Sequence, residues 1–248
     1  DTVKAFEEEL RRTVLSLGAG AAAPARPAFT AERRTAAAAA AAVKRPALVK
    51  RLMKVTAVAI GSSTGGPQAL AKVLEGWSKN GARQPIFITQ HMPPTFTGIL
   101  AEHIGRVSGL QAAEGQDGEA VAPGRIYVAP GGRHMLIEKA NGGAVIRLND
   151  GPQVNFCKPA VDPMFMSLVE VYRDGLLAAV LTGMGRDGRD GAEAVQAAGG
   201  RVIAQDEETS VVWGMPGAVV TGGFADEVLP LAEVGPALAS YAKGGTGR

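Results

Sequence analysis

Two adjacent serines, Ser62 and Ser63, lie in a glycine-rich turn within the stretch AVAIGSSTGGPQAL (residues 57–70). The stretch runs from an apolar segment typical of a buried strand into a segment whose apolar residues have helical spacing. Such a turn could bind a phosphate group, carry a nucleophilic serine, or simply connect a strand to a helix. The three possibilities require different residue types.

The phosphate-binding motifs do not fit this turn. A P-loop places Lys after its last glycine, whereas Pro67 follows Gly66 here, and G-x-G-x-x-G would need glycine where Ser63 stands. Backbone N–H groups at a helix N-terminus can still bind an anion, so an anion site stays open. Residues 61–65, GSSTG, instead match G-x-S-x-G, which holds a nucleophilic serine on a sharp strand-to-helix turn. Ser63, at its centre, is the candidate nucleophile.

A nucleophilic serine needs a base, and the chain has three histidines. His91 directly follows the apolar run PIFITQ (85–90), so we predict that it lies at the same edge of the sheet as Ser63. His103 falls in a predicted helix and His134 opens a predicted hairpin, positions typical of surface or packing histidines. His91 is therefore the candidate general base, although a polar residue that merely ends a strand is the alternative.

The base in turn needs a carboxylate to orient it. The apolar run GLLAAVLTG (175–183) is followed by MGRDGRDG, which offers Asp187 and Asp190. Asp187 is nearer the strand end and between glycines, whereas we expect Asp190 to open or cap the next helix. The predicted triad is Ser63, His91 and Asp187. Its order along the chain differs from the Ser–Asp–His order of the α/β-hydrolases, which argues against a lipase-type esterase.

The elements that must position these residues are short, almost continuously apolar runs separated by helical segments. This pattern predicts an α/β fold: a three-layer, Rossmann-like, doubly wound and mostly parallel sheet, which binds ligands at the carboxyl ends of its strands. Residues 134–150 predict an antiparallel hairpin that turns at Asn141-Gly142-Gly143. The predicted strands are 55–61, 85–90, 125–130, 175–183 and 201–206, and the predicted helices are 67–77, 95–106, 163–173 and 189–198.

The first 53 residues differ from the rest of the chain. Apolar residues at helical spacing predict a helix over 3–17, and the Ala-, Pro- and Arg-rich stretch 18–50 is typical of a flexible linker. The predicted organisation is thus a helix and linker over 1–53 and one catalytic domain over 54–248. The chain begins with Asp1 rather than Met, so we expect it to be a fragment of a longer protein.

Composition limits the classes of partner. A net charge of +2 in 248 residues is too small to indicate nucleic-acid binding, and no apolar stretch is long enough to cross a membrane. A single cysteine, Cys157, excludes an internal disulfide framework and favours a reducing compartment, so we expect a cytoplasmic protein. Cys157 could be a nucleophile, but a packing role is the commoner one.

Taken together, the motifs resemble the catalytic domain of the chemotaxis protein-glutamate methylesterases, the CheB family. The resemblance rests on five segments in family order: AIGSSTGGPQAL, ITQHMPPTFT, IYVAPGGRHM, PAVDPMF and VLTGMGRDGRDG. It implies that Ser63 is the nucleophile, His91 the base and Asp187 its orienting acid. It also implies that the backbone N–H groups of Met184 and Thr64 stabilise the oxyanion.

The resemblance further implies a reaction and its partners. The family removes methyl groups from glutamyl methyl esters on the helical cytoplasmic domain of chemoreceptors, without metal or organic cofactor, and some members also deamidate receptor glutamines. Full-length members usually carry a receiver domain whose phosphorylation relieves inhibition. Residues 1–53 hold no complete receiver pattern, so such control is expected of the parent protein only.

Two other classes of function stay open. A binding module could use the glycine-rich edge to hold an anion or a receptor segment, although it would not need a triad. A serine esterase could instead act on small molecules. Two further residues are singled out: Arg133 as a contact for an acidic receptor surface or a solvated arginine, and Asp162 as the cap of a helix ahead of Pro163.

Overall fold

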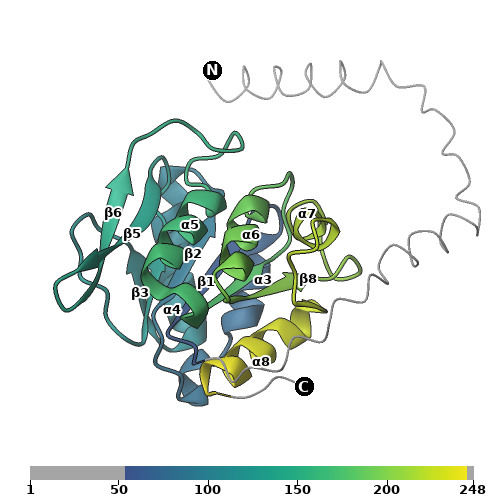
Figure 1. Ribbon diagram of the computed structural model, residues 1–248, viewed down its shortest axis with the longest axis horizontal. Coiled ribbons are helices and arrows are strands. Elements are labelled where there is room, and N and C mark those ends of the chain that lie inside the picture. The colour runs from purple at the N-terminus through teal and green to yellow at the C-terminus, as the bar shows by residue number, and fades with distance from the viewer. Residues whose placement is uncertain (1–53, 245–248) are drawn as a thin grey trace, which may run out of the picture. The chain divides into compact units, whose positions relative to one another are not determined.

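A computed structural model describes residues 54–244 (Figure 1). Seven strands form one sheet in the order β3-β4-β2-β1-β7-β8-β9, and every neighbouring pair is parallel. Their bounds are β1 Ala57–Ser62, β2 Ile86–Gln90, β3 Gln111–Glu114, β4 Arg125–Val128, β7 Leu176–Val180, β8 Arg201–Gln205 and β9 Glu227–Leu229. A separate antiparallel pair consists of β5 His134–Ala140 and β6 Gly143–Asn149.

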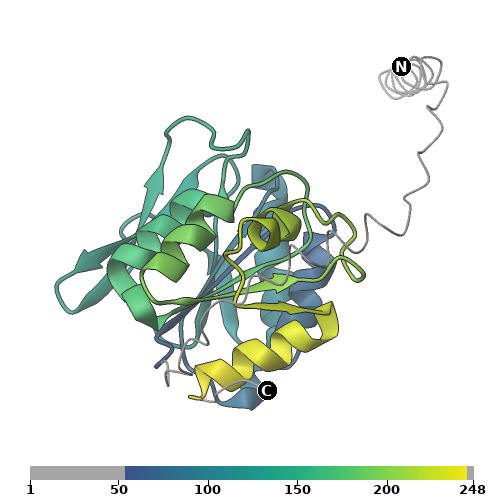
Figure 2. The same cartoon turned by 45° about the vertical axis from the view of Figure 1, so that its right-hand side comes forward.

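Helices cover both faces of the sheet, so the domain has three layers (Figure 2). One face packs against α3 Gly66–Leu74, α4 Pro94–Ser108 and α8 Leu231–Ala242. The other packs against α5 Val161–Tyr172, α6 Arg189–Ala197, α7 Met215–Thr221 and the β5-β6 hairpin. Two short 3-10 helices, Trp77–Asn80 and Arg173–Gly175, complete the helical elements of the described part.

The central strand β1 shows why its sequence is continuously apolar. Val58 and Ile60 pack into the core on the α3 side, whereas Ala57 and Ala59 pack into the core on the α5 side. Because both faces are buried, no polar alternation remains in the strand. The small alanines face the side on which α5 approaches closely: a Cβ at Gly61 would lie 2.5 Å from Val161 Cγ1.

The topology places the site loops together. The chain passes from β1 to β2 on one side and returns through α5 to β7 on the other side of β1. The loops after β1, β2 and β7 therefore meet at the point where the strand order reverses, where doubly wound sheets bind ligands.

Most of the sequence-based fold prediction is confirmed. All five predicted strands, all four predicted helices and the hairpin are present, with end shifts of a few residues and Gly143 in β6 rather than in the turn. The strands β3 and β9 and the helices α7 and α8 were not predicted. The predicted helix over 3–17 and the linker over 18–50 lie outside the described residues. None of the helices within 54–244 is long and apolar enough to cross a membrane.

Candidate active site

The pairing of β1 with β2 brings Ser63 and His91 next to one another. Ser62 and Gln90 are register partners at the ends of these strands, and the His91 N–H donates to the Ser62 carbonyl over 3.1 Å. Ser63 and His91 are each the next residue along the chain. The predicted positions of nucleophile and base at one sheet edge therefore agree with the structure.

The two serines have different environments. Ser62 is fully buried and its hydroxyl donates to Gln90 Oε1 over 2.7 Å. The Gln90 amide then donates to the carbonyls of Ser63 (2.9 Å) and His91 (3.1 Å), tying the two turns together. The Ser63 side chain is half-buried, and within residues 54–244 its hydroxyl has no hydrogen-bond partner. Ser63, not Ser62, therefore has a hydroxyl available for attack.

The loop after β7 lies directly against Ser63. The Ser63 N–H donates to the Thr182 carbonyl over 3.0 Å, and a Cβ added to Gly183 would lie 2.8 Å from Ser63 Cβ. Glycine is thus required for this approach, and Met184 is the next residue along the chain. No backbone carbonyl in the described part of the chain accepts from the N–H of Thr64 or Met184. Their assignment as oxyanion donors stays a prediction.

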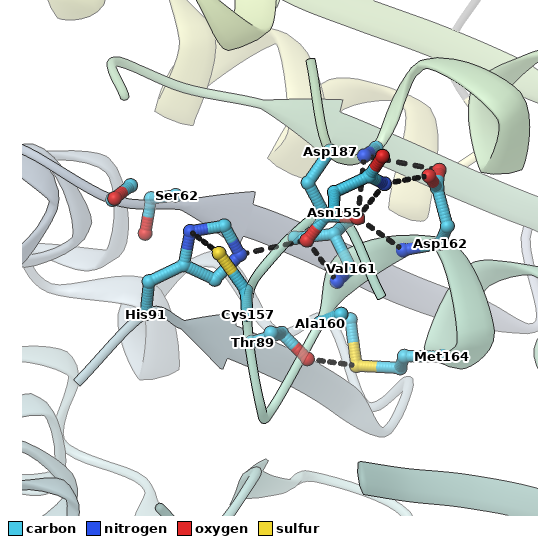
Figure 3. A network of polar contacts seen from close by, with 12 residues as sticks. Ser62, Thr89, His91, Asn155, Cys157, Ala160, Val161, Asp162, Met164 and Asp187 are labelled. Atoms are coloured by element: carbon cyan, nitrogen blue, oxygen red, sulfur yellow. Dashed lines mark hydrogen bonds and ion pairs between the residues drawn. The ribbon is translucent and has the colours of Figure 1, made fainter. Parts of the chain in front are cut away.

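Asp187 holds His91 through the ring nitrogen Nε2 (Figure 3). The distance from Nε2 to Asp187 Oδ2 is 2.7 Å, and the two side chains are 11% and 2% exposed. Burial alone would raise the pKa of Asp187, but hydrogen bonds from His91 and from the Val161 N–H, with the charge of His91, outweigh it and lower the pKa. The ionised carboxylate fixes the proton on Nε2, so Nδ1 is the nitrogen left to accept a proton.

Cys157 also contacts His91. The packing role expected from the sequence did not include this contact. Its Sγ lies 3.4 Å from His91 Nδ1, and the residue is half-exposed. Burial, and then the nearby charge of Asp187, raise the pKa of the thiol. A protonated thiol is a poor nucleophile, so this environment argues against the open alternative that Cys157 attacks substrate.

The raised pKa makes the reactivity of Cys157 testable. At neutral pH the folded protein is expected to react with iodoacetamide about threefold or more slowly than its own thiol does after unfolding in guanidinium chloride. The chain has one cysteine, so total alkylation followed by mass spectrometry reports this thiol alone. A faster reaction in the folded protein would reveal a thiolate–imidazolium pair with His91 and would make Cys157 a nucleophile candidate.

Asp162 does not cap its own helix, contrary to the prediction. It lies inside the first turn of α5, whose N-cap is Ala160, and accepts instead from the backbone of α6. Its other oxygen accepts from Asn155 Nδ2 over 2.8 Å, and the same amide nitrogen donates to Asp187 Oδ1 over 3.1 Å. Burial raises the pKa of Asp162 to about 6, opposed by the Gly191 N–H and Asn155 and reinforced by the charge of Asp187.

The other singled-out residues lie outside this cluster. Arg133 donates to both carboxylate oxygens of Asp150, each over 2.9 Å. Asp190 is in the first turn of α6 and pairs with Arg186 and Arg189 rather than capping the helix.

The two remaining histidines are a surface and a packing residue, as the sequence suggested. His103 is exposed on α4, and His134 is buried and hydrogen-bonded to Pro152 O and Ala160 N. No group of three or more His, Cys, Asp or Glu side chains in residues 54–244 is arranged to hold a metal ion.

Known proteins share this sequence and fold. Residues 58–238 match the family described as CheB methylesterase. A protein-glutamate methylesterase/protein-glutamine glutaminase of group 2 operon from Rhodopseudomonas palustris is 60% identical over 193 residues, 77% of this chain and 49% of that protein. A protein-glutamate methylesterase/protein-glutamine glutaminase 1 from Paramagnetospirillum magneticum is 60% identical over 72% of this chain and 47% of its own length.

A solved structure is similar as well. The Thermotoga maritima CheB methylesterase catalytic domain is 42% identical, with a TM-score of 0.72 over 75% of this chain and 98% of that domain. The chain spans about half the length of the curated relatives it matches. The sequence match, the solved fold and the side chains gathered at the reversal point of the sheet agree: this chain belongs to the CheB methylesterase family.

Proposed function

We propose that this chain hydrolyses glutamyl methyl esters with Ser63 as nucleophile, His91 as general base and Asp187 as the orienting acid. The observation that carries the proposal is the buried His91–Asp187 hydrogen bond of 2.7 Å beside a serine hydroxyl that no group in the described structure engages. Pure binding of an anion or a peptide would not need a histidine oriented by a buried carboxylate in this way.

In the proposed reaction His91 Nδ1 takes the Ser63 proton as Oγ attacks the ester carbonyl. The N–H groups of Met184 and Thr64 then stabilise the oxyanion, a contribution of roughly 3 to 4 kcal/mol for each donor lost in comparable sites. The tetrahedral intermediate expels methoxide, which takes the proton from His91 and leaves as methanol. Water, deprotonated by His91, attacks the acyl-enzyme; the second tetrahedral intermediate expels the Ser63 alkoxide, which takes that proton back from His91, and the glutamate product is released.

We propose that the substrate of this site is a protein side chain rather than a small ester. Three of the most exposed large apolar side chains lie on loops at the site: Phe156 (95% exposed), Met184 (73%) and Val211 (70%). Phe156 also has a φ of 64°, a left-handed conformation that is costly for an aromatic residue. Exposed apolar groups around a reactive centre are typical of a macromolecular contact surface.

We propose that the partner is the methylated helical domain of a chemoreceptor and that these three side chains contact it. Arg133 is the lesser proposed contact, because its guanidinium already holds Asp150. The relatives are also named protein-glutamine glutaminases, and amide hydrolysis at a receptor glutamine would use the same serine with ammonia as the leaving group. The parent protein is proposed to act in the cytoplasm under the control of a receiver domain.

The test is methanol release from a methylated receptor cytoplasmic fragment. We expect one methanol for each new glutamate carboxylate found by mass spectrometry, and an acid-trapped acyl group on the peptide that contains Ser63. The unmethylated fragment is the control. Binding without methanol release would favour the binding module, and a higher kcat/KM on p-nitrophenyl acetate than on the receptor would favour the small-molecule esterase.

A further inference from the structure

The helices α5 and α6 both begin without a cap of their own. The N-cap residues are Ala160 for α5 and Gly188 for α6, and neither supplies a side-chain hydrogen bond. The first N–H groups of a helix have no partner within the helix, and leaving them unpaired in a buried site is costly. Both helix ends lie in the buried region around Asp187.

Each helix is capped by an aspartate of the other. Asp187, just before α6, accepts from the N–H groups of Val161 (2.6 Å) and Asp162 (3.1 Å) at the start of α5. Asp162, in α5, accepts through Oδ1 from the N–H groups of Gly188 (3.0 Å) and Gly191 (2.7 Å) at the start of α6, and the Gly188 N–H is shared with Asp187 Oδ1 (3.1 Å). The exchange is reciprocal, and the positive ends of both helix dipoles face the two carboxylates.

The side chain of Asn155 links the carboxylates of Asp162 and Asp187. Its amide nitrogen donates to Asp162 Oδ2 and to Asp187 Oδ1, so Asp162 uses both of its oxygens within this network. The helices α5 and α6 pack closely here, because a Cβ at Gly191 would lie 2.7 Å from Phe165 Cβ on α5. The turn that carries Asp187 is therefore held by an aspartate outside the predicted triad, at Gly191 and, shared with Asp187 itself, at Gly188.

We propose that Asp162 is a positioning residue for catalysis: by holding the start of α6 it sets the turn that directs Asp187 Oδ2 at His91 Nε2. The proposal rests on the triad of the proposed function. It goes beyond a stabilising helix cap, because it ties the geometry of the His91–Asp187 hydrogen bond to a side chain that touches neither His91 nor Ser63. Asp162 itself transfers no proton and contacts no substrate.

The test compares Asp162→Ala and Asp162→Asn with Asp190→Asn. Asp190 lies in the first turn of α6, the helix end that Asp162 contacts, but it pairs with Arg186 and Arg189 on the surface. Its replacement therefore controls for the loss of a negative charge near this helix end. In Asp162→Asn the new amide oxygen could still accept from Gly188 and Gly191, but the amide nitrogen would face that of Asn155, so rescue is expected to be partial. Only variants whose thermal unfolding midpoint lies well above the assay temperature are compared.

The expected result is a kcat on the methylated receptor fragment reduced about ten- to a hundredfold in Asp162→Ala, with KM changed less than about threefold. Asp162→Asn should lie between this variant and wild type, and Asp190→Asn should stay within about twofold of wild type. The low-field proton NMR signal of the His91–Asp187 hydrogen bond should weaken in Asp162→Ala and persist in Asp190→Asn.

A folded Asp162→Ala or Asp162→Asn variant with unchanged kcat and an unchanged low-field signal would overturn the positioning role. If Asp162→Ala does not fold, Asp162→Asn decides by the same two readouts. Absence of activity in the wild type would instead contradict the proposed function, so the two failures are distinguishable.

Discussion

Replacing Ser63 with alanine is expected to lower kcat for methanol release by roughly 10⁴-fold or more, because the proposed nucleophile is lost and the neighbouring Ser62 hydroxyl is buried and bonded to Gln90. The Ser63 hydroxyl has no hydrogen-bond partner in the described structure, so its removal leaves no buried group unsatisfied. The thermal unfolding midpoint should therefore stay close to that of wild type. The measurement is a single-turnover assay of methanol release, combined with a thermal unfolding curve.

The matched control is Ser62→Ala, one residue away in the same turn. Its hydroxyl is buried and bonded to Gln90 Oε1, so the substitution should lower the free energy of unfolding by about 1–3 kcal/mol. Its kcat per folded molecule should stay within about threefold of wild type. Equal losses of activity in the two variants, or full activity in Ser63→Ala, would contradict the assignment of the nucleophile.

Replacing Asp187 with asparagine is expected to lower kcat about 10⁴-fold, because the histidine would change tautomer. All partners of the carboxylate are donors: the His91 ring, the N–H groups of Val161, Asp162 and Gly188, and the Asn155 amide. An amide nitrogen at this site can be satisfied only if His91 gives up its Nε2 proton and carries one on Nδ1. Nδ1 could then no longer accept the proton of Ser63.

The same substitution should alter the dependence of stability on pH. The pKa of Asp187 is lowered in the folded state, so the ionised carboxylate stabilises the fold above its unfolded pKa of about 3.9. That stabilisation is lost as the pH falls below this value. The difference in unfolding free energy between wild type and Asp187→Asn, measured with urea, should be largest near neutral pH and shrink below about pH 4. A difference that grows on acidification would contradict the lowered pKa.

The sequence alone determined the central part of the fold and the positions of the proposed triad. Strands buried on both faces leave continuous apolar runs, and such runs are local, so β1, β2, β4, β7 and β8 are all predictable. The residues that follow them must meet at one sheet edge, so the sequence alone points to Ser63, His91 and Asp187. The choice between Ser62 and Ser63 also followed from a local motif.

Tertiary packing determines the structure of segments whose local sequence disfavours the element that they form. The helix α8 contains Gly235 and Pro236, both unfavourable inside a helix. A Cβ at Gly235 would lie 2.4 Å from the Val73 carbonyl oxygen, so the glycine lets α8 pack closely on α3. The edge strands β3 and β9 are only partly buried, and one ends and the other begins with a glutamate, so neither has the continuous apolar run of a strand buried on both faces.

The surroundings of the triad also came only from the tertiary structure. Asn155 and Cys157 lie in a segment without periodicity, yet they contact Asp187 and His91 across 32 and 66 residues of chain. Asp162 was predicted to cap its own helix and instead caps α6. A sequence pattern records burial and backbone preference for a short segment, whereas the partner of a buried polar group depends on which helix ends and loops the folded chain brings together.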